Sequence, residues 1–172
     1  MKRRSWLKLG LGGAVLLGVV GGAGVGLALL RPGLVNGHMS PSARELMRAV
    51  ALSVMDGLWP APGAARDAAV QAHLDRVDAN IGGYPAAVRA ELSQLFALLG
   101  SSGGRLALIG MSQDWPQASA AEIQVTLNEL RLSRLDLRQQ IYHALRDLNT
   151  IAFFTAPEHW ASTGYPGPRE IP

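Results

Sequence analysis

The chain has no cysteine among its 172 residues. This absence excludes disulfide bonds, thiolate zinc sites, Cys-ligated iron–sulfur clusters, covalently attached c-type haem and thiol nucleophiles. Acidic residues are also missing from a long N-terminal stretch, where the first is Glu45. Charge is therefore distributed unevenly along the chain.

The basic pI of about 9.8 comes from the N-terminus. Five of the 16 Lys and Arg residues lie there: Lys2, Arg3, Arg4, Lys8 and Arg31. Removing them leaves 11 cations, all arginine, against 13 Asp and Glu, a formal charge of −2. A nucleic-acid-binding face needs concentrated basic charge. We therefore expect no nucleic-acid partner.

The first residues resemble a twin-arginine (Tat) export signal. The residues that carry the pattern are Arg3, Arg4, Trp6, Leu7 and Lys8. An uncharged, glycine-rich run follows over residues 9–30, which is long enough to span a bilayer core about 30 Å thick. We expect residues 1–31 to be a Tat signal or membrane anchor, and the protein to be periplasmic.

The sequence leaves two fates open for this leader. Gly26 and Ala28 provide small residues at the spacing that a signal peptidase reads, but no Ala-x-Ala sequence is present. Cleavage would release the protein into the periplasm. Retention would tether it to the inner membrane through an N-terminal helix.

The body is predicted to be all-α, an irregular bundle of about five helices in one domain over residues 42–154. Apolar residues at helical spacing place these helices over residues 42–56, 64–80, 85–99, 119–132 and 134–154. Two prolines and two glycines indicate a linker over residues 32–41. Ser42 with Glu45 and Ser119 with Glu122 have the spacing of capping boxes at two of these helix starts. Residues 100–104 are expected to be a flexible break, and the apolar segment 105–111 after it is too short for the pattern to distinguish helix from strand.

The C-terminal tail, residues 155–172, is rich in proline and contains Trp160 and Tyr165. Such a segment cannot bury itself as a helix, so it either packs over the bundle or docks on another protein. Trp59 and Trp115 also precede prolines at turns between helices. The sequence leaves open whether these two cover the core or form an interface.

Catalytic chemistry is not expected from this chain. His73 and His143 are placed on polar sides of their helices, where solvated side chains are the ordinary case. No His-x-x-x-His spacing, G-x-S-x-G sequence or P-loop occurs. We therefore assign no catalytic, cofactor-binding or metal-binding residue.

Two segments resemble a known family. The turn over residues 58–64 and the ending over residues 153–168 are similar to the small subunit (subunit 3) of gluconate 2-dehydrogenase and related membrane-bound sugar and alcohol dehydrogenases. In that family a Tat leader precedes a small helical domain, which ends in an aromatic pair, a spaced Trp and Gly-Tyr-Pro-Gly. Residues 80–130 match only in helical character.

The resemblance implies an escort role in an oxidoreductase complex. The expected partner is an FAD-dependent catalytic subunit of the glucose-methanol-choline type without its own export signal. The small subunit stabilises it and carries it, already loaded with FAD, through the Tat translocase; a cytochrome c subunit commonly accepts the electrons. The expected partner contacts here are Trp160, Tyr165, Pro166 and Gly167.

A different class of function stays open beside this one. The chain would then be a self-sufficient, membrane-anchored helical protein that binds a small ligand or haem through His143 or His73. An absorbance spectrum of the purified protein separates the two hypotheses, because bound haem gives a Soret band.

Overall fold

The computed structural model of the protein describes residues 31–168. The Tat pattern and the apolar run of the leader lie outside these residues, as do residues 169–172. The described elements are β1 (Leu34–Val35), β2 (His38–Met39), α3 (Pro41–Val54), α4 (Ala64–Gly82), α5 (Ala86–Gly100), α6 (Ser102–Ile109), α7 (Ala120–Arg131), α8 (Asp136–Phe154) and the 3₁₀ helix η1 (Pro157–Thr163). The prediction of an all-α protein is confirmed.

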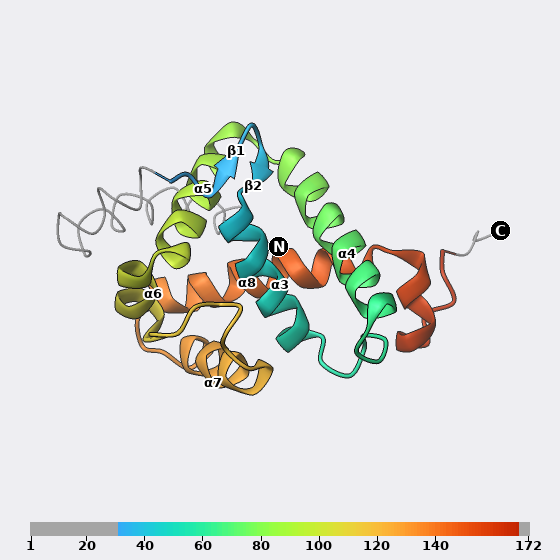
Figure 1. The fold of residues 1–172 in the computed structure, drawn as a ribbon. Coiled ribbons are helices and arrows are strands. Elements are labelled where there is room, and N and C mark those ends of the chain that lie inside the picture. The colour runs from blue at the N-terminus through green and yellow to red at the C-terminus, as the bar shows by residue number, and fades with distance from the viewer. Residues whose placement is uncertain (1–30, 169–172) are drawn as a thin grey trace.

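Helix α3 is the centre of the bundle (Figure 1). It packs against α4, α5, α7 and α8, which surround it. Leu46, Met47 and Val50, which recur at helical spacing, have no exposed surface, while Val54 at the end of the helix is partly exposed. The predicted stripe thus faces neighbours in several directions, and alanines at positions 43 and 51 let those neighbours approach closely.

The helix starts follow local capping chemistry. At α7 the predicted capping box is present: the Ser119 hydroxyl accepts from the Glu122 backbone N–H, and the Glu122 carboxylate accepts from the Ser119 N–H. At α3 the cap is Ser40, two residues earlier than a box on Ser42 would give. Pro41 causes this shift, because proline suits the first helical position and needs no hydrogen-bond partner there.

The structure describes six α-helices, one more than predicted. The additional helix, α6, starts in the break expected over residues 100–104, because the Ser101 hydroxyl accepts the Gly104 N–H at 3.1 Å. Helices α5 and α6 meet at 99°. Within residues 31–168 no single helix has the length and apolar composition to cross a membrane, although α5 and α6 taken together meet those two criteria.

The linker predicted over residues 32–41 is instead a β-hairpin. Asn36 and Gly37 have φ angles of 53° and 86°, as the tight turn of a two-residue hairpin requires. The hairpin is fastened at both ends, because the Met39 N–H donates to Asp78 on α4 at 2.7 Å and the Gly33 N–H donates to the Ser93 carbonyl on α5 at 3.2 Å. The chain is therefore part of the folded body from Gly33 onward.

Substituting Gly33 with alanine is expected to destabilise the fold. A Cβ atom at this position would lie 2.4 Å from the Phe96 Cβ and 2.5 Å from the Ser93 carbonyl oxygen. Relieving that overlap requires movement of the α5 backbone, with a typical cost of about 1–3 kcal/mol in the free energy of unfolding. Urea denaturation measures the change, and Gly103→Ala, which meets no atom within 4 Å, is the matched control.

Candidate functional site

The C-terminal segment folds back on the bundle beyond α8 (Figure 1). Arg76 on α4 holds it in place: its Nε donates to the Ala152 carbonyl at 3.1 Å, and a guanidinium nitrogen lies 3.3 Å from the Glu158 carboxylate. The imidazole of His159 stacks on the Phe153 ring with centroids 3.7 Å apart. The part of the tail up to Trp160 thus packs on its own bundle.

Trp160 organises the rest of the tail. Its indole N–H donates to the Phe154 carbonyl at 2.8 Å, and the Tyr165 ring meets it edge-on with centroids 5.3 Å apart. Gly167 lies against the indole, since a Cβ atom there would be 3.2 Å from the ring, and its φ angle of 94° also favours glycine. Four of the residues in the family-like ending thus form one structural unit.

This unit exposes apolar surface. Tyr165 is 49% exposed, Phe154 is 40% exposed, and Ile151, one helical turn before Phe154, is 47% exposed. We call Ile151, Phe154, Trp160 and Tyr165 the C-terminal aromatic face. Of the four predicted partner contacts, Tyr165 and Pro166 point to the solvent, Trp160 is half-buried, and Gly167 is buried beneath them.

The adjacent residue Phe153 points the opposite way, into the core. It is 1% exposed and meets the Trp59 indole edge-on, with centroids 5.3 Å apart. Trp59 is itself buried and donates its indole N–H to the Ala51 carbonyl. The aromatic pair 153–154 therefore links a packed interior to the exposed face.

His73 lies in this interior, so its predicted place on a polar side of α4 is wrong. Its side chain has no exposed surface and packs edge-on against Trp59 and Phe153. The spacing carried the signal: His73 follows Val70 by three residues and precedes Val77 by four, which puts it within the apolar stripe. A buried polar partner, Asn149 on α8, makes this position tolerable for an imidazole.

The hydrogen bonds fix how His73 and Asn149 are oriented. The Asn149 amide nitrogen donates to the Leu145 carbonyl at 2.9 Å, so its oxygen must accept from His73 Nε2, 2.9 Å away. The other ring nitrogen, Nδ1, is buried without a hydrogen-bond partner. Burial lowers the pKa of His73, and the positive charges of Arg76 and His159 lower it further, while the bond with Asn149 acts in the opposite direction.

Acidification is expected to destabilise the protein through His73. The unfolded chain takes up a proton near the ordinary pKa of 6.5, whereas the folded state keeps the imidazole neutral until a lower pH. Stability is thus complete above pH 6.5 and falls as the pH drops towards the folded-state value, with a slope of up to about 1.4 kcal/mol per pH unit for one proton.

Urea denaturation at several pH values between about 7 and 5 measures this slope. His73→Leu should reduce it, because the fully buried titrating group is gone, while His159, whose pKa is also lowered by burial, still contributes. His143→Gln is the matched control, because it removes an exposed histidine and keeps the buried one. An equal slope in the wild type and in His73→Leu would contradict the prediction.

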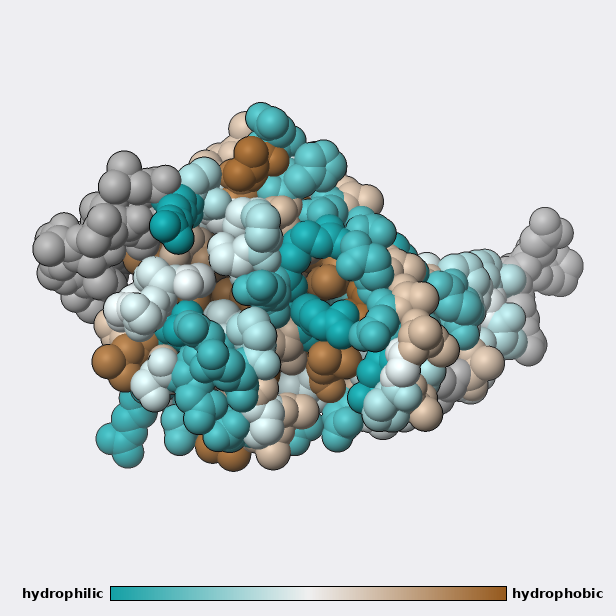
Figure 2. All heavy atoms as spheres, in the orientation of Figure 1, coloured by the Kyte–Doolittle hydropathy of each residue, from teal (hydrophilic) through white to brown (hydrophobic). Residues whose placement is uncertain are grey.

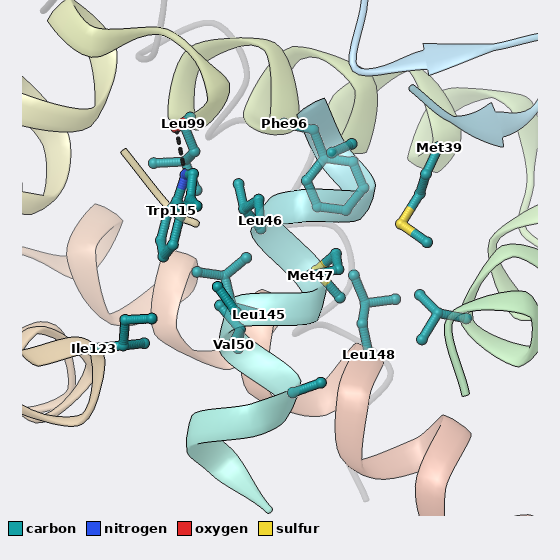
Figure 3. Close-up of a cluster of buried hydrophobic side chains, with 14 of the residues drawn as sticks. Met39, Leu46, Met47, Val50, Phe96, Leu99, Trp115, Ile123, Leu145 and Leu148 are labelled. Atoms are coloured by element: carbon teal, nitrogen blue, oxygen red, sulfur yellow. Dashed lines mark hydrogen bonds between the residues drawn. The ribbon is translucent and has the colours of Figure 1, made fainter. Parts of the chain in front are cut away.

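The second tryptophan at a turn, Trp115, also covers the core (Figure 3). It is 4% exposed, and its indole N–H donates to the Leu99 carbonyl at 2.8 Å. Trp59 and Trp115 both border a groove of about 460 Å³ between the end of α3 and the turn before α7. Since both indole donors are already satisfied by backbone carbonyls, the groove does not present them to a ligand.

Hydrophilic side chains gather over α3 and α4 on the face shown in Figure 2. Arg44 on α3 contacts Asp75 and Asp78 on α4, and Arg48 contacts Asp67. The acidic residues of α4 thus pair with α3 across the helix interface. The Asp75 and Asp67 carboxylates are exposed, so their pairs add little stability. The Arg44–Asp78 pair is partly buried and ties α3 to α4.

The two histidines of the ligand-binding alternative do not meet at a common surface. His73 is buried beside Asn149, whereas His143 is exposed on α8. Within residues 31–168 no group of three His, Asp or Glu side chains is arranged to hold a metal ion.

Comparison of the chain with models of protein families, with curated proteins and with solved structures gives no match in any of the three. The fold and the site define a small all-α protein with a solvent-exposed aromatic face built by its C-terminal tail. The family resemblance of residues 58–64 and 153–168 stays a prediction.

Proposed function

We propose that the protein is a non-catalytic small subunit that escorts an FAD-dependent dehydrogenase subunit through the Tat translocase and stabilises it in the periplasm. The observation that carries the proposal is the pairing of two features. The N-terminus has the Tat pattern around Arg3 and Arg4, and the C-terminal ending resembles that of small subunits of such dehydrogenases. A folded-protein export signal is useful to a partner that must acquire FAD before export.

The geometry of the tail supports a role in binding another protein. Residues that the resemblance singles out converge on one place, where Gly167 supports Trp160 and Trp160 positions Tyr165. The core side of this unit is fixed by Arg76 and by the stacked ring of His159. Rigid, partly exposed aromatic side chains of this kind are enriched in the energetic centres of protein interfaces.

Removal of two side chains from the C-terminal aromatic face tests this proposal. The double substitution Phe154→Ala with Tyr165→Ala removes rings that are 40% and 49% exposed, so the fold should persist. If these rings anchor the partner, the loss of about 2 kcal/mol or more at such positions weakens the complex at least about thirtyfold. The measurement is the amount of flavin and dye-linked dehydrogenase activity that copurifies with the tagged full chain from its native host.

Val125→Ala serves as the matched control. Val125 is 60% exposed, and it lies on α7 away from the tail. This variant should retain the flavoprotein at the wild-type level. Flavoprotein retention that is unchanged in the double variant would remove the C-terminal aromatic face from the proposal, and purified complexes that carry no flavin would overturn the proposed partner class.

A further inference from the structure

A second surface, at the opposite end of the molecule, combines exposed leucines with arginines. The turn between α7 and α8 contains Leu132 and Leu135, which are 67% and 64% exposed, the largest fractions among the exposed large apolar side chains of the described residues. Arg131, the last residue of α7, and Arg134 lie on either side of Leu132, and both are exposed. We call these four residues the Arg–Leu turn.

Neither arginine of this turn forms an ion pair within the described part of the chain, a property they share with Arg66 and Arg89, whose guanidinium groups donate to backbone carbonyls instead. Five arginines of the described region form ion pairs with carboxylates: Arg44, Arg48, Arg76, Arg105 and Arg146. Arg131 instead donates to the Asn128 side chain, and no ion pair is formed by Arg134 among residues 31–168. Glu129 and Asp136 lie nearby in sequence and are exposed, without pairing to either arginine. The turn thus offers two guanidinium groups beside two solvent-exposed leucines.

The start of the folded body limits how far the body can lie from a membrane that holds the N-terminal apolar run. Gly33 is hydrogen-bonded to Ser93 and packed against Phe96, so only Arg31 and Pro32 separate it from the end of the apolar run at Leu30. Three backbone steps span at most about 11 Å. A body of this size has a radius of gyration of about 14 Å. If the run stays in a bilayer, the body must therefore lie against the lipid headgroups.

The fold then selects which side faces the lipid. In Figure 1 the described chain starts on the side of the molecule where α6 and the turn between α7 and α8 also lie, and the tail lies on the other side. Leu106 on α6 adds a further exposed leucine, 56% exposed. Helix α8, 19 residues long, separates the turn at Leu135 from the C-terminal aromatic face by about 28 Å.

We infer that the body lies on an anionic bilayer surface through the Arg–Leu turn, while the C-terminal aromatic face points away from the membrane. Leucine side chains favour the boundary between headgroups and acyl chains, and guanidinium groups bind phosphates there. The inference rests on the proposed function in one respect, which is that the exported chain keeps its leader. In the inferred orientation of the body, the C-terminal aromatic face stays accessible to the proposed partner.

Site-specific fluorescence quenching tests this orientation, and the absence of cysteine makes single labels straightforward. The full chain is labelled through Ser133→Cys in the turn or through Ala65→Cys at the start of α4, and then reconstituted in vesicles that contain phosphatidylglycerol. Lipids with a nitroxide on the headgroup serve as the quencher. We expect the label at position 133 to be quenched several-fold more than the label at position 65.

Two variants define what the contact depends on. Leu132→Ser combined with Leu135→Ser should reduce quenching at position 133 several-fold, while Val125→Ser, also at an exposed apolar residue, should not. Equal quenching at positions 133 and 65 would overturn the inference. Failure of the full chain to float with the vesicles would overturn it too, because the tether would then be absent. Neither outcome bears on flavoprotein copurification, which tests the proposed function separately.

Discussion

Replacement of both Arg3 and Arg4 with lysine is expected to leave the protein and the proposed dehydrogenase partner in the cytoplasm. The substitution keeps the positive charge of the leader, so it changes only the chemistry of the side chains. A guanidinium group offers five donors in a planar fork, whereas a lysine ammonium is a point charge, and a receptor that reads the paired arginines distinguishes the two. We expect a nearly complete loss of the periplasmic fraction.

Cell fractionation measures this effect on two molecules at once: the tagged protein, by immunoblot, and the proposed partner, by flavin-dependent dye reduction. Arg31→Lys is the matched control, because it makes the same chemical change at the other end of the leader, outside the Tat pattern. Dehydrogenase activity that stays periplasmic in the Arg3/Arg4 variant would refute the escort role, whatever happens to the small subunit.

Phe153→Ala is expected to have the largest effect on stability. The ring is 1% exposed, meets Trp59 edge-on and stacks on His159 of the tail. Its removal leaves a cavity at the place where α4, α8 and η1 meet, and truncation of a buried phenylalanine typically costs about 3–5 kcal/mol. Domains are stable by only about 5–15 kcal/mol, so a substantial part of the total is lost.

The adjacent residue provides the control for this experiment. Phe154→Ala removes the same ring from the next position on α8, where it is 40% exposed, and should cost less than about 1 kcal/mol in urea denaturation. The two variants should therefore separate stability from partner binding: Phe153→Ala lowers the unfolding midpoint, and Phe154→Ala weakens flavoprotein retention. Similar midpoints for both variants would contradict the packing described for Phe153.

The sequence predicted well what depends on local spacing. Helical periodicity placed the cores of α3, α4, α5, α7 and α8, and the Ser119–Glu122 spacing predicted the capping box of α7. The predictions of a linker over residues 32–41 and of a break over residues 100–104 were wrong, although both segments contain a local signal for the structure that forms. Asn36-Gly37 is a strong hairpin turn, and Ser101 is a helix cap, yet the prolines and glycines around them suggested a linker and a break.

Other features depend on residues that are far apart in the chain. The buried place of His73 requires Asn149, 76 residues later, to satisfy its Nε2. The fixed position of the tail requires Arg76 to reach Ala152 and Glu158. Periodicity within one helix contains no information on such partners, because each helix carries only its own half of the contact.

The sequence by itself determined the charge of the leader, the all-α class and the aromatic, proline-rich composition of the ending, since all three follow from residue types and short-range spacing. Only the tertiary structure decided that Phe153 faces inward and Phe154 outward, that Gly167 supports Trp160, and that the exposed turn at Leu132 lies at the far end of α8 from this face. The physical reason is that burial is a property of the whole assembly of helices, and each side chain acquires its environment from elements that are distant in sequence.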